Sequence, residues 1–274
     1  MEQYTDIIRK RVSVRTYKPD PVEKEKLDEL SAFITSNSTG PSGTRVRIAI
    51  SGQGTLSRED ARKYGTYSII RGASLYLIGI VSSGSPPEDF GYVFEKAVLK
   101  SADLGLGTCW LGGTFRRSDF AEAAGLKDNE LLFAVSPLGY SADHRSLADR
   151  AVRTIARSSG RLPFEQLFFE GRELAPLSQD AAGEPLELVR LGPSASNRQP
   201  WRVVRTGKVF HFYLARTRGY GKSLDVMDAA DLQRGDIGIA MCHFDLATGK
   251  TAEGWVREDP GLDCSYEYIA SRTL

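Results

Sequence analysis

The chain has 274 residues, of which 41% are hydrophobic, so it can bury a sizeable core as one large or two small domains. Lys and Arg number 36 and Asp and Glu 35, and the net charge of +1 gives no electrostatic reason to expect nucleic acid or an acidic membrane surface as a partner. Cys109, Cys242 and Cys264 are odd in number and far apart, which favours reduced thiols over a disulfide framework.

The first half of the chain alternates predicted helices and strands. Its expected elements, in chain order, are an amphipathic helix at 23–34, a turn at 40–43, strands at 46–51 and 74–81, a long helix at 87–104, a strand at 109–111, a short helix near 118–124 and a strand at 131–137. Cys109, inside a glycine-rich loop, is expected to be a small buried filler.

A connecting surface segment is predicted at 144–160, which is rich in Arg, Ser and Asp and short of large apolar groups. The elements expected after it are an apolar helical turn at 163–169, a helix at 185–191, strands at 201–205 and 209–215, a long helix at 232–246, and strands near Trp255 and Tyr266. His243, on the apolar long helix, is expected to be a satisfied interior histidine.

No segment is predicted to enter a membrane. The longest apolar stretch, 73–81, is interrupted by Ser74 and Gly79 and is far shorter than the roughly 20 residues that a spanning helix needs. The N-terminus carries Glu2 and Asp6 and lacks the apolar core of a signal peptide. We therefore expect a cytoplasmic protein.

The order of elements in the second half repeats much of the first, which predicts an internal duplication. Pro41-Ser42 matches Pro193-Ser194 at an offset of 193 minus 41, or 152. Trp110 matches Trp255 at an offset of 255 minus 110, or 145. The two offsets differ modestly, as insertions and deletions after a duplication would allow.

The most informative stretch is 193–201, which reads PSASNRQPW. It follows an apolar helix that Gly192-Pro193 ends, and it precedes a strand beginning at Trp201. Small polar donors, a carboxamide pair and an aromatic at such a junction indicate a ligand site. The alternative is a serine-rich connector whose Asn and Ser side chains satisfy their own turn.

This stretch resembles the element of flavin-dependent nitroreductases in which a helix ends in Pro-Ser, followed by Asn and then Gln-Pro-Trp, and which contacts FMN. Two further segments agree. Residues 9–15, RKRVSVR, resemble the family's Arg-x-Ser-x-Arg element, which grips the flavin phosphate and the polar edge of the ring. Residues 104–113, LGLGTCWLGG, are similar to the loop that lies against the reactive face of the isoalloxazine.

The resemblance is to the fused two-repeat subfamily, the TM nitroreductases, and it implies an α+β nitroreductase-like fold. Two tandem repeats would form a pseudo-dimer within one chain, so we expect a monomer, and further association of the chain stays open. The repeats are expected at 1–145 and 163–274, with a connector at 146–162.

One FMN per chain is expected, because each repeat has lost a different part of the family's pattern. The first repeat has Arg45 at the position of Asn197 and no Gln-Pro-Trp after it. The second reads Trp255-Val256-Arg257-Glu258, without the paired glycines that let a flat ring approach the backbone. In this family each FMN site takes parts from both subunits, so each site of the pseudo-dimer would take parts from both repeats. Both lost parts belong to the same one of these two pseudo-sites, and the other pseudo-site stays complete.

The resemblance implies FMN as cofactor and NADH or NADPH as electron donor, with hydride passing to flavin N5 and then to a nitro compound, a quinone or a related small acceptor. No catalytic side chain is required, because the flavin performs the chemistry, and backbone N–H groups of Gly112 and Gly113 are expected near N5. Arg157 is an alternative to Arg161 for the phosphate. The expected FMN-binding residues are Arg11, Ser13, Arg15, Leu111, Gly112, Gly113, Arg161, Ser194, Ala195, Ser196, Asn197 and Gln199.

Other functions are less well supported by the sequence. A dinucleotide fingerprint beginning at Gly105 fails because its third glycine would fall on Trp110. The run 192–196 lacks the second glycine of a hydrolase elbow, and no Cys, His or carboxylate cluster has metal-ligand spacing. A flavin carrier without turnover, or a fused fold that has lost flavin, stays open.

Overall fold

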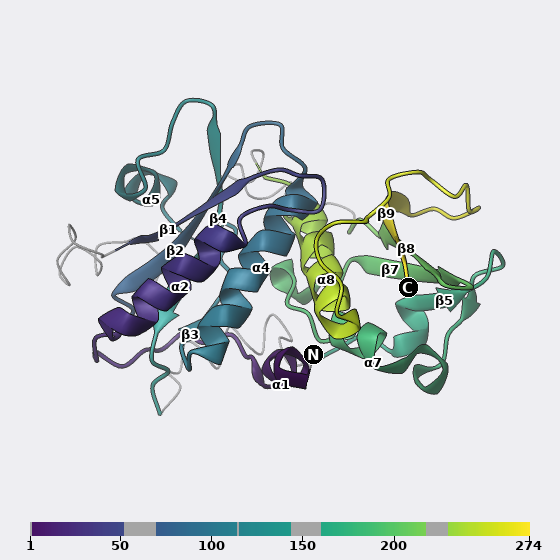
Figure 1. Ribbon diagram of the computed structural model, residues 1–274, viewed down its shortest axis with the longest axis horizontal. Coiled ribbons are helices and arrows are strands. Elements are labelled where there is room, and N and C mark those ends of the chain that lie inside the picture. Colours follow the sequence, from purple (N-terminus) through teal and green to yellow (C-terminus); the bar gives the residue numbers. More distant parts are fainter. Residues whose placement is uncertain (1, 52–69, 114, 144–159, 218–229) are drawn as a thin grey trace.

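The computed structural model describes residues 2–51, 70–113, 115–143, 160–217 and 230–274. Two long helices, α4 (Pro87–Asp103) and α8 (Leu232–Thr248), lie side by side between two β-sheets (Figure 1). Each long helix packs on the sheet of its own half of the chain. The architecture is therefore α+β, with both sheets facing a central helix pair.

The first sheet is antiparallel, with strand order β1-β2-β4-β3. Its strands are β1 (Val46–Ser51), β2 (Leu75–Ser82), β3 (Gly107–Thr108) and β4 (Glu130–Gly139). On β2, Leu77 belongs to the core shared with α4, whereas Tyr76 and Ile78 pack with Phe120 of α5 (Arg117–Ala123). Both faces of this sheet are therefore covered, which explains the nearly continuous apolar run at 75–81.

The second sheet has strand order β6-β5-β7-β8-β9 and one parallel pair, β5 with β7. Its strands are β5 (Phe168–Glu170), β6 (Ala175–Pro176), β7 (Trp201–Thr206), β8 (Val209–Leu214) and β9 (Glu267–Thr273). Phe210 and Phe212 of β8 contact Phe244 of α8, so this sheet also turns an aromatic face to the central helices.

Shorter helices complete the layers. They are α1 (Glu2–Lys10), α2 (Lys24–Ser36), α7 (Gln179–Arg190) and the 3-10 turns η1 (Phe164–Gln166) and η2 (Ala195–Asn197). Helix α2 packs beside α4, and α1 contacts α4, α7 and α8. An ion pair of 3.0 Å between Arg9 and Glu184 joins α1 to α7, so the first helix touches both halves of the chain.

Glycines let α4 and α8 approach at backbone distance. A Cβ placed on Gly238 would lie 2.0 Å from the carbonyl oxygen of Glu88, and one on Gly91 would lie 1.9 Å from that of Gly235. Real Cβ atoms do not approach that closely, so any side chain at these positions would force the helices apart. The pairing of the two halves therefore depends on glycine at the helix contact.

Most predicted elements are confirmed, and the differences concern a few segments. Helix α1 was not predicted. The strand expected at 109–111 is β3 at 107–108 followed by a single pairing of Leu111 with Val135. Helix α7 begins at Gln179 and is broken at Gly183, where φ is 69°, before Pro185 restarts it. The strand expected near Trp255 is a single bridge between Val256 and Ser271.

The remaining predictions concern 144–169. The apolar turn expected at 163–169 is η1 followed by strand β5, because Phe168 joins the second sheet beside Val203. Almost all of the predicted connector lies outside the described residues.

Gly238→Ala tests the helix contact. At an unconstrained interior helix position alanine would add about 1 kcal/mol of stability. Here the methyl group meets the α4 backbone, and we expect a net loss of about 1–3 kcal/mol in the free energy of unfolding measured by urea denaturation. Glu122→Ala on the exposed face of α5 is the control and should change stability by less than about 0.5 kcal/mol. A stabilised Gly238→Ala protein would contradict the close approach.

Candidate functional site

A cavity of about 380 Å³ opens where α8 meets the segment after α1 and the loops 110–113 and 191–197. This volume lies in the range of small-molecule and cofactor sites. The cavity brings together segments from both halves of the chain. Every site residue predicted from the sequence lines it except Gln199: Arg11, Ser13, Arg15, Leu111, Gly112, Gly113, Arg161, Ser194, Ala195, Ser196 and Asn197.

Four arginines line this cavity: Arg9, which is paired with Glu184 at 3.0 Å, and Arg11, Arg15 and Arg161. Arg161 donates to the carbonyl oxygens of Leu191 and Gly160, both at 3.0 Å, and to Asn197 Oδ1 at 3.2 Å. Burial, together with the neighbouring charges of Arg11 and Arg190, lowers the pKa of Arg161 to about 10. The gathered positive charge makes this part of the cavity suited to an anion. Arg157, the other phosphate candidate, lies outside the described residues.

Apolar side chains supply the rest of the wall. They come from α1 and the residues after it, from the glycine loop, from β4 and from α8: Ile8, Val12, Trp110, Leu111, Phe133, Leu191, Leu232 and Ile239. A cavity with cations in one part and apolar surface in another fits a ligand with an anionic group and an extended apolar body.

The glycine loop is fixed to the first sheet. Leu111 N donates to the carbonyl of Val135 at 2.9 Å, and Val135 N donates back at 3.0 Å. Just before it, Trp110 Nε1 donates to the fully buried Glu95 at 2.7 Å. A Cβ on Gly112 would lie 2.5 Å from the side chain of Leu232 on α8. The loop therefore runs close to α8 at the cavity wall, where a side chain on Gly112 would have to displace that of Leu232.

The loop 194–199 holds an unusual backbone. Ser196, Asn197 and Gln199 have φ values of 50°, 53° and 49°, a left-handed conformation that non-glycine residues rarely adopt. Ala195 N donates to both carboxylate oxygens of Asp236 on α8, at 3.0 and 3.1 Å. Gln199 N donates to Ser194 Oγ at 2.9 Å. These bonds hold the loop against α8 and present its polar groups to the cavity.

Gln199 lies behind the cavity wall. Its side chain is buried, with Oε1 accepting from Leu162 N at 2.8 Å and Nε2 donating to the Asn197 carbonyl at 3.3 Å. Its left-handed backbone turns the carboxamide toward the segment at 160–162. The structure thus gives it a supporting position, behind the residues that line the cavity.

Sequence reasoning did not single out Trp110, Phe133 or Asp236 as cavity residues. Trp110 stands inside the predicted glycine loop, so its place in that motif was a usable signal. Asp236 begins an otherwise apolar run on the long helix, and a carboxylate at such a position is a second signal. Phe133 looks like any core residue of a buried strand, and nothing in its sequence context marks it.

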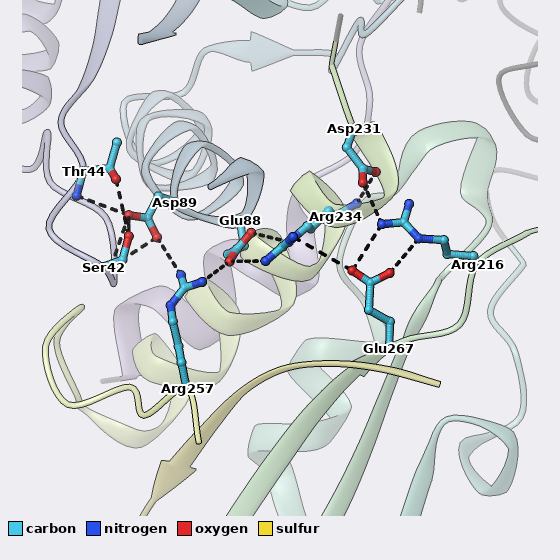
Figure 2. A network of polar contacts seen from close by, with 9 residues as sticks. All are labelled: Ser42, Thr44, Glu88, Asp89, Arg216, Asp231, Arg234, Arg257 and Glu267. Carbon is cyan, nitrogen blue, oxygen red and sulfur yellow. Dashed lines mark hydrogen bonds and ion pairs between the residues drawn. The ribbon is translucent and has the colours of Figure 1, made fainter. Parts of the chain in front are cut away.

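The opposite side of the α4–α8 pair carries a chain of charges (Figure 2). Asp89 of α4 accepts from Ser42 N and Thr44 N, and Arg257 contacts it at 3.5 Å. Arg257 also binds the fully buried Glu88 at 2.5 Å, and Arg234 binds Glu88 at 2.8 Å. Arg216 extends the chain to Asp231 at 2.8 Å and Glu267 at 2.7 Å. Figure 2 shows the guanidinium of Arg257 directed at both acidic side chains of α4.

Other chemistries find no support in the described part of the chain. No group of three or more His, Cys, Asp and Glu side chains there could hold a metal ion. His243 is fully buried, with Nδ1 donating to the Leu188 carbonyl at 2.8 Å and Nε2 3.0 Å from Glu95 Oε1, as an interior histidine should be. Cys109 is buried, as expected for a core filler.

The family model described as Putative TM nitroreductase matches residues 3–248. A crystal structure of a putative nitroreductase from Thermotoga maritima is similar to the chain with a TM-score of 0.56 and 16% identity, over 98% of this chain and 91% of that one. That likeness supports a nitroreductase-like fold. No curated protein matches the sequence.

Two weaker similarities are to clostridial structures. One is an FMN-dependent nitroreductase from Clostridium difficile R20291, with a TM-score of 0.42 and 20% identity over 51% of this chain and 88% of that one. The other is a nitroreductase family protein from Clostridium difficile 630, with a TM-score of 0.44 and 20% identity over 59% and 94%. Among the described helices of the present chain, none has the length and apolar character needed to cross a membrane.

Gln199→Ala tests the supporting position of that side chain. The substitution leaves Leu162 N without its buried acceptor, and we expect the free energy of unfolding to fall by about 1–3 kcal/mol. Urea denaturation measures the change, and Gln166→Ala on an exposed turn should stay within about 0.5 kcal/mol of the parent protein. Unchanged stability in Gln199→Ala would show that the carboxamide does not support the loop.

Proposed function

Because the chain belongs to the TM nitroreductase family, we propose that it is an FMN-dependent oxidoreductase that accepts hydride from NADH or NADPH and passes reducing equivalents to a nitro compound, a quinone or a related small acceptor. The observation that carries the proposal is the cavity, in which four arginines, a glycine loop and the loop 193–197 meet. The FMN-dependent relative from Clostridium difficile is consistent with this choice of cofactor.

The residues of the cavity fit FMN by their chemistry. Arg11, Arg15 and Arg161 would hold the dianionic phosphate, because guanidinium groups present paired donors and stay charged. Within the described residues, Arg11 Nε is buried without a hydrogen-bond partner, and its nearest acidic oxygen, on Glu95, is 4.0 Å away. An unsatisfied donor of this kind favours an acceptor supplied by a ligand.

The apolar wall and the glycine loop would hold the ring. FMN, when bound, supplies the hydride and electron transfer that no side chain of the cavity can perform. Gly112 and Gly113 bring backbone without side chains to the cavity wall, and their N–H groups are the proposed donors near N5. Ser194, Ser196 and Asn197 would add neutral hydrogen bonds from the C-terminal half of the chain, while Trp110 and Leu232 exclude water.

We further propose that the chain is a fused duplicate, with repeats at 1–145 and 163–274 and a connector at 146–162. Three pairs of contacts support it. Asp89 accepts from Ser42 N as Asp236 accepts from Ala195 N. Trp110 donates to Glu95 of α4 as Trp255 donates to Asp245 of α8. Leu111 pairs with β4 as Val256 pairs with β9. Such a chain would form the pseudo-dimer by itself, so we propose that the protein is a monomer. We also propose that it is cytoplasmic.

One FMN per chain follows from the unequal pseudo-sites. At the duplicate's offset of 257 minus 112, or 145, Arg257 corresponds to Gly112, the residue that leaves room for the ring. The Arg257 side chain instead reaches Glu88 and Asp89 and fills the second pseudo-site with an ion pair (Figure 2). A second flavin would have to displace this arginine from a fully buried carboxylate, which is costly.

The visible spectrum of the purified protein, with flavin extracted and counted per chain, tests the proposal. We expect a yellow protein, or one that becomes yellow on reconstitution, with one FMN per chain. Anaerobic addition of NADH or NADPH should bleach the colour rapidly. Persistent colour would favour a flavin carrier, and a colourless protein that cannot be reconstituted would favour a fold without flavin.

Arg15→Ala and its matched control Arg257→Ala test whether FMN binds in the cavity. Loss of a charged hydrogen bond from Arg15 should weaken FMN binding by about 1.5–3 kcal/mol, measured by titrating the apo-protein with FMN and following flavin fluorescence. Arg257 lies outside the cavity, and Arg234 still pairs with Glu88 when Arg257 is removed, so the affinity should stay unchanged. The stoichiometry should also stay at one, because the second pseudo-site still has Arg45 at the position of Asn197 and no Gln-Pro-Trp. Equal loss in the two variants would contradict the assignment of the site.

A further inference from the structure

Asp236 is a carboxyl group in the cavity wall that the proposed function does not use. It lies on α8, is 5% exposed, and lines the cavity beside Gly235 and Ile239. Its two oxygens accept one hydrogen bond each from the same donor, Ala195 N, at 3.0 and 3.1 Å. One shared N–H donor compensates little for the burial of a carboxylate. Buried carboxylates are normally paired with a cation or accept several hydrogen bonds.

The chain contains its own comparison for this group. Asp89 lies at the corresponding place on α4, and it accepts from Ser42 N, from Ser42 Oγ and from Thr44 N, with the Arg257 guanidinium at 3.5 Å. At the Asp236 side, the position that corresponds to Arg257 is Gly112, which has no side chain. In the described residues, no cation forms an ion pair with Asp236. The Asp236 side thus lacks the cation that Arg257 supplies on the other side.

The charges around Asp236 do not replace that missing cation. Arg234, on the same helix, is directed at Glu88 of α4. Arg11, Arg15 and Arg161 line the same cavity but form no ion pair with it. Burial, and the negative charge of Asp231 at the start of the helix, raise the pKa of Asp236 well above its usual value, against the opposing effect of the Ala195 hydrogen bond. These surroundings favour the protonated form of the carboxyl group over the charged form.

We propose that Asp236 is a neutral carboxylic acid in the folded protein and that it donates a hydrogen bond to an acceptor atom of the flavin ring system bound in the cavity. The inference rests on the proposed function. One oxygen keeps the bond from Ala195 N, and the other carries the proton toward the cavity. A neutral donor recognises carbonyl and imine acceptors of the ring while avoiding a buried negative charge next to them, which an ionised group would impose.

The protonation state can be measured without flavin. The infrared difference spectrum between the parent protein and Asp236→Asn, both in the apo form at pH 7, should contain the carbonyl band of a protonated carboxyl group in the parent. A carboxylate band in its place would overturn the inference. Asp89→Asn, measured in the same way, is the matched control, and its difference spectrum should contain a carboxylate band because Arg257 and three donors stabilise the charged form.

The donated bond is tested by riboflavin binding, because riboflavin lacks the phosphate, whose own titration would obscure that of Asp236. Asp236→Asn keeps a neutral N–H donor and an acceptor for Ala195 N, so its affinity should stay within about threefold of the parent. Asp236→Leu keeps the volume but no donor, and it should bind about tenfold more weakly. Asp89→Asn should leave the affinity unchanged. Equal losses in Asp236→Asn and Asp236→Leu would overturn the inference.

The pH dependence gives a second readout. Because the folded pKa of Asp236 is raised, the donor is present at low pH and is lost as the pH rises through that pKa. Riboflavin affinity of the parent should therefore fall at high pH, while that of Asp236→Asn stays level; parallel profiles would contradict the inference. If the parent binds neither riboflavin nor FMN, the proposed function itself fails. If it binds both but Asp236 is ionised, only this inference fails.

Discussion

The backbone contact between α4 and α8 determines where everything else in the molecule can lie. Gly91 and Gly238 allow the two helices to meet without intervening side chains, and each helix carries the sheet of its own half. Near the start of each helix a carboxylate reaches across to a loop: Asp89 to Ser42, and Asp236 to Ala195. The helix contact thus fixes two loops from distant parts of the sequence on opposite sides of one helix pair, and one of these loops borders the cavity.

Buried carboxyl groups on the two sides of the α4–α8 pair have different electrostatic surroundings. On one side Glu88 and Asp89 are fully buried, and Arg234 and Arg257 compensate them directly. This chain of charges continues through Arg216 to Asp231, which also caps α8 by accepting from Arg234 N at 3.1 Å. The filled side therefore holds the first turn of α8 in place. That same turn presents Leu232 and Gly235 to the cavity, so an internal ion-pair network on one side supports the wall of an open site on the other.

Sequence patterns predicted the motifs of the site but not the direction of every side chain. The arginine segment, the glycine loop and the Pro-Ser-Asn segment could be predicted because each is local and rich in residues with distinctive chemistry. Gln199 belongs to the same motif, yet the left-handed backbone at Ser196, Asn197 and Gln199 turns it behind the wall, and non-glycine residues give no sign of such a conformation. The sequence does not predict helix α1, because the helix is short and mostly polar. Its residue Ile8 is buried only where α4, α7 and α8 converge. Asp236 acquires its environment from a loop that lies 41 residues away along the chain.

The positive charge in the cavity supports the proposal that an anionic group binds there. Arg161 is held by the carbonyl oxygens of Leu191 and Gly160 and by Asn197 Oδ1, all neutral acceptors. Burial, followed by the nearby positive charge of Arg11, lowers the pKa of this guanidinium. Glu95 is the closest acidic group to Arg11, but it already accepts from Trp110 and contacts His243. Under the proposed function a ligand phosphate would add negative charge beside these arginines, whereas at Glu88 the chain supplies two arginines of its own.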